Sequence, residues 1–356
     1  MNGMALCGAF FEECVCPILA KNFPTLAYSA GLVGFGSDVL GYDDEVSRDH
    51  LWGPRLYIFP REYSDALKVA LGTALKRELP RTFRGFSVGF GAPDAHGISV
   101  MAEGEEEFQP LVWIMPFSAF LMGEIGRPSA DAISPAEWLA FSEHRLLSLT
   151  RGRLFRDDLG LSREFQKLAV YPRDVWLYLL YSDWSAISEE RAFVKRTAAR
   201  GDDLGSRVIA ARIVHRLMHL AFLYEKRFAP YAKWFGTAFQ ELFVYSALEP
   251  MLARALHAHD REERELAIAR AQAIMIEFHN ETGLTPPIDA SIHPYFNRDI
   301  KVVSSDAVAD ALHGLIADKA LKSLPPIGAL SAVGNLTALC ENAAYLPRLR
   351  ALYEVR

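Results

Sequence analysis

The sequence has few cysteines for its length. Its 356 residues include only Cys7, Cys14, Cys16 and Cys340, too few for a disulfide framework. Sparse cysteines are typical of a reducing compartment, so we expect a cytoplasmic protein. Cys14 and Cys16 could form half of a zinc site, but the sequence offers no second pair to complete it. Small apolar side chains in a core explain them better.

The sequence also lacks long apolar runs and an excess of positive charge. No uncharged apolar stretch reaches 18 residues, and Glu12 and Glu13 interrupt the apolar N-terminal segment, so neither a membrane span nor a signal peptide is predicted. The formal net charge is −6. We therefore expect no extended nucleic-acid surface, because such surfaces need clustered Lys and Arg. A local basic pocket for a nucleotide remains compatible with this charge.

The length favours two domains over one, because single hydrophobic cores seldom grow past roughly 250–300 residues. Apolar spacing in the first third predicts alternating helices and strands. The predicted elements are a helix at 4–16 that ends near Pro17, strands at 27–37 and 56–59, a helix at 62–78, and strands at 83–90 and 97–103. This order predicts a small α/β domain with a mixed sheet over residues 1–132.

The pattern changes near Pro135, after which the apolar residues follow helical spacing. The predicted helices are 135–149, 161–169, 172–197, 203–227, 230–256, 260–283, 306–320 and 335–352. We therefore expect a larger, all-helical domain over residues 133–356, and an α+β protein as a whole.

The segment GFGSDVLGYDDEVSRDH, residues 34–50, carries the pattern with the clearest chemistry. Gly36 and Ser37 follow a predicted strand, where glycine lets the backbone approach a phosphate and serine donates a hydrogen bond. Eleven residues separate Ser37 from Asp49, which lies at the predicted start of the next strand. Nucleotidyl transfer needs both features, since carboxylates hold the divalent ions that neutralise developing charge.

This spacing is similar to the Gly-Ser…Asp-x-Asp pattern of the polymerase-β-like nucleotidyltransferase superfamily. The wider segments GSDVLGYDDEVSRDHLWGPR, GRLFRDDLG, YPRDVW, GDDLGSRVIAAR and RFAPYAKWFGTAF, in this order, resemble the family "domain of unknown function 4037" (DUF4037), which is grouped in that superfamily. The resemblance covers roughly residues 1–250, and a shared fold alone does not fix a reaction. It implies an adenylyltransferase that binds ATP and Mg²⁺ and transfers a nucleotidyl group to a hydroxyl of a small-molecule, protein or RNA acceptor.

The resemblance also implies roles for single residues. Asp49 is the catalytic carboxylate and binds Mg²⁺, with His50 and Asp44 as further metal candidates. The candidates for nucleotide binding are Gly36, Ser37, Arg55, Arg212, Arg216, Tyr231 and Lys233, and Lys233 is the preferred triphosphate contact outside the first domain. His50 could instead be a packing residue, and Arg55 could equally form a surface salt bridge.

Two positions depart from the superfamily pattern. Leu51 stands where a second carboxylate is expected, and Ser99 stands where a third is expected on a later strand. Neighbouring acidic residues could substitute; they are Asp43, Asp44, Glu45, Asp94 and Glu103. The alternative hypothesis is a catalytically degenerate protein that binds a nucleotide, or regulates, without a two-metal site.

The predicted helix 203–227 carries Arg212, His215, Arg216 and His219 on one basic stripe. The stripe is either a solvated face or a surface that meets phosphates or an acidic substrate, for which Arg is well suited. His215 and His219 have metal-ligand spacing, but no Glu follows the first His as in metalloproteases. A more distant hypothesis is a toxin-like ribonuclease acting through Arg212 and His219.

Overall fold

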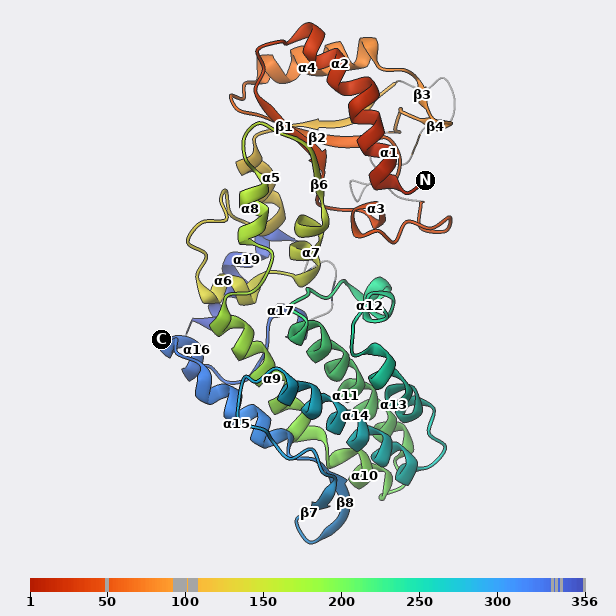
Figure 1. The fold of residues 1–356 in the computed structure, drawn as a ribbon, viewed down its shortest axis with the longest axis vertical. Helices are drawn as coiled ribbons and strands as arrows, with labels where there is room; N and C mark the ends of the chain where they lie inside the picture. The colour runs from red at the N-terminus through yellow and green to blue at the C-terminus, as the bar shows by residue number, and fades with distance from the viewer. Residues whose placement is uncertain are drawn as a thin grey trace. The chain divides into compact units, whose positions relative to one another are not determined.

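The computed structural model describes residues 1–48, 51–91, 101, 108–333, 336, 339 and 342–354 (Figure 1). The chain is mostly helical with small sheets, which confirms the α+β class. It forms two compact units, each of which is described by itself. Unit 1 comprises Met1–Ile133, His144–Ala169 and Glu341–Leu346, and unit 2 comprises Ser134–Glu143, Val170–Cys340 and Pro347–Arg356.

Unit 1 is built on a four-stranded mixed sheet. Its strands are β1 (Tyr28–Leu32), β2 (Arg55–Pro60), β5 (Leu111–Ile114) and β6 (Arg153–Asp157), in the order β5-β2-β1-β6. β1 runs antiparallel to both β2 and β6, and β2 runs parallel to β5. β6 corrects the prediction that everything after residue 133 is helical. Its strand conformation depends on pairing with β1, which a local pattern does not reveal.

The N-terminal helix of unit 1 continues past Pro17 and does not end there, contrary to prediction. It runs through α1 (Gly3–Phe10), a π-helical turn (Phe11–Val15) and α2 (Cys16–Asn22). Pro17 lies in the first turn of α2, where a missing N–H costs little. The preceding turn is wide, because the N–H of Cys16 donates to the carbonyl of Phe11.

This helix, Gly3–Asn22, is 20 residues long with a mean hydropathy of 1.5, enough by length and composition alone to cross a membrane. In the structure its apolar side chains, including Leu6 and Phe10, are buried in the core of unit 1. Core helices of folded domains have the same length and composition. The predicted absence of a membrane span therefore stays a prediction.

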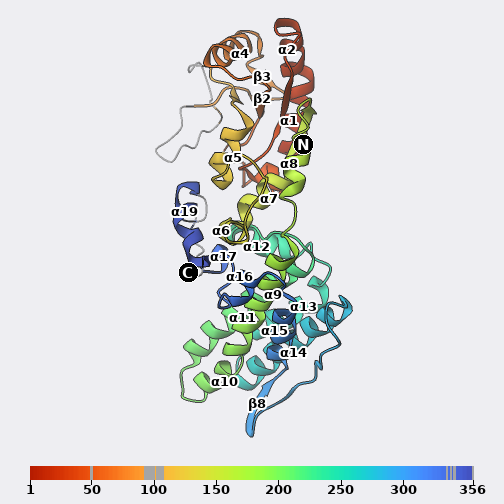
Figure 2. The ribbon, with the colours of Figure 1, turned by 90° about the vertical axis from the view of Figure 1, so that its left-hand side faces the viewer.

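Alternate residues of β2 pack on opposite faces of the sheet. Leu56 and Ile58 join the core formed with the N-terminal helix and α4 (Asp65–Glu78). On the other face Tyr57 and Phe59 pack against Phe120 of α5 (Phe117–Ile125). Their ring centroids lie 5.0 and 5.3 Å, respectively, from the ring centroid of Phe120. Helices therefore cover both faces, as Figure 2 shows for α1 and α5.

The strand predicted at 83–90 is instead a short hairpin of β3 (Thr82–Phe83) and β4 (Phe86–Ser87). Arg84 and Gly85 form its turn, both at positive φ (49° and 85°), as tight hairpin turns require. Of the strand predicted at 97–103, only Met101 belongs to the described residues.

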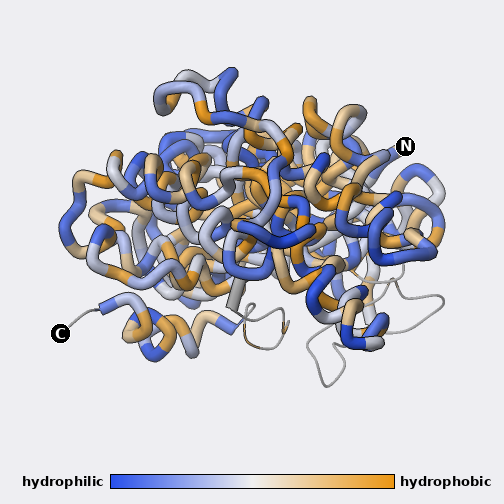
Figure 3. The backbone as a smooth tube through the Cα atoms, turned by 90° about the horizontal axis from the view of Figure 1, so that it is seen from below, coloured by the Kyte–Doolittle hydropathy of each residue, from blue (hydrophilic) through white to orange (hydrophobic). Residues whose placement is uncertain are grey.

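Among the described residues of unit 2, the regular structure is helical apart from the hairpin of β7 (His293–Tyr295) and β8 (Arg298–Val302). α9, α11, α14 and α15 lie side by side in both ribbon views (Figures 1 and 2). Hydrophobic and hydrophilic residues alternate over short distances along the backbone trace in Figure 3, as expected of helices that bury one face in a core. The helices are α6 (Pro135–Ala140), α9 (Arg173–Glu190), α10 (Phe193–Ala198), α11 (Asp203–Tyr224), α12 (Ala232–Phe239), α13 (Tyr245–His257), α14 (Arg261–Glu281), α15 (Ser305–Leu315) and α16 (Lys319–Ser323), with short turns at α17 (Leu330–Val333), α19 (Leu346–Leu349) and Arg350–Tyr353.

The helix predicted at 135–149 is broken between α6 and α7 (Glu143–Arg151). Phe141 leaves the helical region with ψ 142° and ends α6, so Glu143 is the first residue of the next helix. The break matters because Glu143 completes a buried polar cluster in unit 2.

Candidate functional site

The predicted phosphate-binding residues lie in one turn that follows β1. Gly34 and Gly36 both have positive φ, 80° and 138°. A Cβ at Gly36 would lie 2.2 Å from Arg55 Nη2 and 2.2 Å from Asp38 Oδ1, so this position accepts only glycine. Ser37 begins the one-turn helix α3 (Ser37–Leu40), and its Oγ donates to the carbonyl of Ser47 at 2.8 Å.

Replacing Gly36 by alanine is expected to destabilise unit 1 by at least about 2 kcal/mol, because its backbone conformation is strained for any L-residue. Gly72 provides the matched control, since it lies within α4 and a Cβ there would meet nothing within 4 Å. Gly72→Ala should stabilise α4 by about 0.5–1 kcal/mol. Hydrogen exchange of peptides from β1 and α4 measures both effects, and equal responses would contradict the assignment of Gly36.

Arg55 begins β2 and forms a buried ion pair behind this turn. Its Nη2 lies 2.6 Å from Asp38 Oδ1 and 2.8 Å from the carbonyl of Phe35, and both charged side chains are 1% exposed. Burial lowers the pKa of Arg55, but the Asp38 carboxylate offsets this and raises it. The predicted surface salt bridge is therefore a buried one. The prediction that Arg55 reaches a phosphate is corrected too, because its guanidinium is enclosed.

The acidic loop after α3 satisfies donors of its own unit. Asp43 accepts from the backbone N–H of Gly3 at 2.5 Å and from Trp52 Nε1 at 2.9 Å. Asp44 Oδ1 accepts from the N–H of Ser47 at 2.8 Å. Across the part of the chain that the structure describes, no group of three His, Cys, Asp or Glu side chains is placed to hold a metal ion.

The other predicted metal residues, Asp49 and His50, lie outside the described residues, as does Ser99. Leu51 is described, and it corrects a prediction. It lies in the loop before β2 with φ 46°, so it does not occupy a strand position two residues beyond Asp49. The strand begins later, at Arg55, because the loop must first bring the buried Trp52 into the core.

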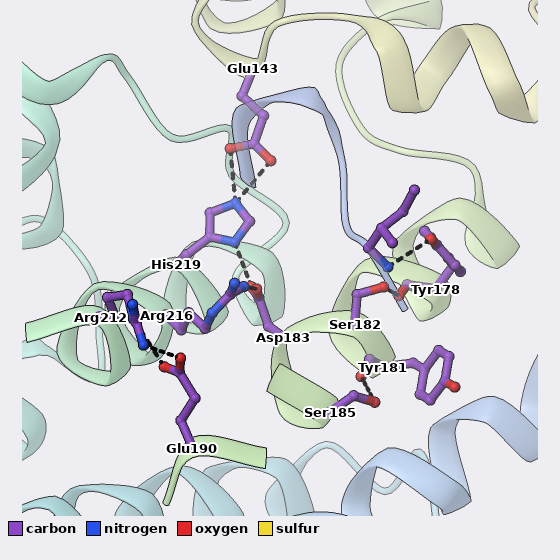
Figure 4. Close-up of polar contacts among 11 residues, drawn as sticks. Glu143, Tyr178, Tyr181, Ser182, Asp183, Ser185, Glu190, Arg212, Arg216 and His219 are labelled. Atoms are coloured by element: carbon purple, nitrogen blue, oxygen red, sulfur yellow. Dashed lines mark hydrogen bonds and ion pairs between the residues drawn. The ribbon is translucent and has the colours of Figure 1, made fainter. Parts of the chain in front are cut away.

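The nucleotide-binding candidates of the helical region all belong to unit 2. Tyr231 precedes α12, and Lys233 Nζ lies 4.8 Å from the ring centroid of Trp234, which is itself buried. Arg212 pairs with Glu190, and Arg216 Nη1 lies 3.0 Å from Asp183 Oδ1 (Figure 4). Both guanidinium groups therefore have partners in their own unit.

The predicted basic stripe on α11 is not one surface. Arg212 and His215 are exposed, whereas His219 is 8% exposed. The ring of His215 stacks on Phe235, with centroids 4.7 Å apart and planes 16° apart. This corrects the expectation of a continuous basic face, because the helix turns its last member into the core.

A cluster around His219 is the most completely formed polar centre of unit 2. Its Nδ1 lies 2.5 Å from Asp183 Oδ2, and its Nε2 lies 3.0 and 3.1 Å from the two oxygens of Glu143. Figure 4 shows the imidazole ring of His219 between the carboxylates of Glu143 and Asp183. With both nitrogens facing carboxylate oxygens, the imidazole is held as a cation that donates twice.

The carboxylate of Glu143 has two more donors. The hydroxyl of Tyr171 lies 3.1 Å from Oε1, and the backbone N–H of Ala229 lies 3.1 Å from Oε2. With Arg216 on Asp183, two anions and two cations balance, which is how buried charges are tolerated. The cluster ties the start of α7 to α9 and α11. A His219 held in this way does not fit its predicted roles as metal ligand or nuclease residue.

One carboxylate of each of two acidic pairs, Asp157-Asp158 and Asp202-Asp203, accepts hydrogen bonds at the start of a helix. Asp202 caps α11 by accepting from the N–H of Gly205 at 2.7 Å. Asp157 accepts from the N–H groups of Leu161 and Ser162, at 2.7 and 3.0 Å, at the start of α8 (Ser162–Lys167). These carboxylates are N-caps and turn residues.

Residues 138–235 match the model of a protein family described as "Domain of unknown function (DUF4037)". The match supports the resemblance to this family. It contains the His219 cluster, with Glu143 and Asp183, and it does not extend to the Gly36–Ser37 turn. No curated protein matches the chain.

The acidic partners Asp38, Glu143 and Asp183 were not predicted from the sequence. A signal was present for Asp183, which stands alone in the apolar run VWLYLLYSDWSAI. A carboxylate on the buried face of a helix needs a cationic partner. The identity of that partner, 36 residues away in the sequence, required the packing of α9 against α11.

Proposed function

We propose that this chain is a nucleotidyltransferase-fold protein that binds a nucleoside triphosphate, with ATP as the first candidate, at the Gly36–Ser37 turn of unit 1. The observation that carries the proposal is the conformation of this turn. Gly36, four residues after the end of β1, has φ 138°, a conformation that glycine adopts readily, and it leads into Ser37 at the start of α3. The mixed sheet gives further support.

Of the two uses of a bound nucleotide, the described residues favour binding without transfer. β2 carries no carboxylate, and its first residue, Arg55, is neutralised by Asp38. Asp43 and Asp44 are engaged by N–H donors. A protein of this kind would use the nucleotide as a regulatory ligand.

Nucleotidyl transfer is the second candidate, and the spacing of Asp49 from Ser37 favours it. In that case a hydroxyl of a small molecule, a protein or an RNA end would accept the nucleotidyl group. Mg²⁺ would be held by Asp49, and its bound phosphates would supply further oxygens.

Calorimetry on the full chain tests the binding proposal, with ATP, GTP, CTP and UTP titrated in the presence and absence of Mg²⁺. We expect one nucleotide to bind, with the Ser37 hydroxyl turning from the carbonyl of Ser47 to a phosphate oxygen. Ser37→Ala should therefore weaken binding by roughly three- to tenfold. Ser323→Ala is the matched control, since this exposed hydroxyl donates only to a carbonyl of its own helix. The absence of binding for all four nucleotides would refute the proposal.

Incubation with α-labelled ATP and candidate acceptors separates the two uses. Nucleotide binding without label transfer or pyrophosphate release supports the regulatory protein. If label is transferred and Asp49→Asn abolishes the transfer, the protein is a nucleotidyltransferase and the regulatory hypothesis is wrong.

A further inference from the structure

A pocket of about 430 Å³ opens on unit 2. Its lining includes Tyr171, Arg173, Trp176, Tyr224, Lys226 and Thr282, all of which belong to that unit. This volume lies within the range of small-molecule sites, which are mostly apolar with a few placed polar groups.

Lys226 enters this pocket from an unusual backbone position. α11 ends in a motif in which the N–H of Lys226 donates to the carbonyl of Leu223 and the N–H of Arg227 donates to that of Phe222. The residue between these bonds must be left-handed, and glycine is the usual choice. Here it is Lys226, with φ 53°. A lysine held there costs backbone strain, and strain of this kind is concentrated at functional sites.

The side chain of Lys226 places a cation over an aromatic floor. Its Nζ lies 5.0 Å from the ring centroid of Trp176. Trp176 is fixed in turn, because its Nε1 donates to the carbonyl of Leu223 at 2.6 Å. The lysine and the ring therefore form one rigid unit with the end of α11.

The aromatic hydroxyls near the pocket are bonded to groups of the protein. Tyr171 donates to Glu143, and the hydroxyl of Tyr224 lies 2.9 Å from His279 Nδ1 and accepts from Trp184 Nε1. The rings of Tyr171 and Tyr224 therefore line the pocket, whereas their hydroxyls are hydrogen-bonded to other protein groups.

The charge of the pocket is positive. Arg173 makes only long contacts, 3.4 Å to Asp174 Oδ1 and 3.4 Å to the carbonyl of Leu315. Together with Lys226 it gives the described lining two cations and no carboxylate. An anion entering the pocket would replace water around these two positive groups. The carboxylate of Asp174 lies outside the lining and accepts from the backbone N–H groups of Ala317 and Asp318.

We propose that this pocket binds an aromatic phosphate monoester, with the phosphate dianion between Lys226 and Arg173 and the ring against Trp176 and Tyr171. Two cations match a dianion, and the ring faces match a flat apolar body. The proposal does not depend on nucleotide binding in unit 1.

Equilibrium dialysis of the full chain with 1-naphthyl phosphate tests the site. We expect saturable binding, with 1-naphthol and inorganic phosphate each binding at least tenfold more weakly, because each lacks one half of the recognised ligand. Lys226→Gly should weaken 1-naphthyl phosphate at least tenfold. The same variant should unfold at an unchanged or higher temperature, since glycine relieves the left-handed strain. Arg173→Gln should also weaken binding.

Phe296→Gly is the matched control, because Phe296 is an exposed residue of unit 2 with a similar φ of 55° outside the pocket lining. It should leave the affinity unchanged. Equal affinity of Lys226→Gly and the unaltered protein would overturn the proposal, as would inorganic phosphate binding as tightly as the ester. ATP binding is measured on the same variants. If ATP binds Lys226→Gly with unchanged affinity and binds Ser37→Ala more weakly, the pocket of unit 2 is a different site from the one in unit 1.

Discussion

Replacing Glu143 by alanine is expected to destabilise unit 2 by about 3–5 kcal/mol, the cost typical of removing one partner from a buried ion pair. The substitution takes away the acceptor for His219, the hydroxyl of Tyr171 and the N–H of Ala229 at once. His219 would remain between α7 and α9 with a carboxylate on one side only. Each buried donor that loses its acceptor adds its desolvation cost.

Hydrogen exchange of peptides from α9 and α11 measures this loss within unit 2, so unfolding of unit 1 does not obscure it. Glu189→Ala is the control, because Glu189 is an exposed residue of α9 and surface substitutions usually change stability by less than about 0.5 kcal/mol. If both variants exchanged at the same rate, the cluster would not stabilise the unit.

The same cluster predicts how the stability of unit 2 depends on pH. Burial lowers the pKa of His219, but Glu143 and Asp183 together raise it well above the ordinary value. The folded unit therefore keeps a proton that the unfolded chain releases near pH about 6.5. The stabilisation is complete below that pH and is lost as pH rises through the folded pKa. His219→Gln should flatten this decline between neutral and alkaline pH, and an unchanged slope would show that another group causes it.

Local patterns were sufficient for some elements and not for others. The N-cap role of Asp202 involves only a turn and a helix that adjoin it in the sequence, so a local pattern is sufficient to indicate it. The turn at Gly36–Ser37 follows in the same way from a strand and two glycines. β6 escaped prediction because its conformation is stabilised by pairs such as Ser29 with Asp157, which the chain brings together only on folding.

The candidate sites show the same division. Arginine is a residue type that often binds phosphate. Only the folded structure shows that Arg55 is buried in an ion pair with Asp38. His219 has metal-ligand spacing from His215, but their directions on α11 separate them, one toward solvent and one toward two carboxylates. Residue type and spacing identify chemistry that is available, whereas burial and partners decide whether it is free to act.

Replacing Asp38 by alanine is expected to destabilise unit 1 by about 3–5 kcal/mol, because it leaves the guanidinium of Arg55 buried without a counter-charge. Both side chains are 1% exposed, so water cannot replace the carboxylate without opening the core. The exposed pair of Lys21 and Glu78, with side chains 71% and 19% exposed, provides the contrast. Lys21→Ala should cost at most about 1 kcal/mol, as measured by hydrogen exchange of β1 and β2 peptides.

The double variant Asp38→Leu with Arg55→Met separates the charge from the shape of the site. Replacing both partners by apolar residues of similar size should recover most of the lost stability, since a buried ion pair gains little over good apolar packing. Arg55 also holds the carbonyl of Phe35, one residue before Gly36. If nucleotide binds at this turn, the double variant should be stable and yet bind ATP more weakly. A double variant as unstable as Asp38→Ala would mean that the ion pair has a structural role beyond charge neutralisation.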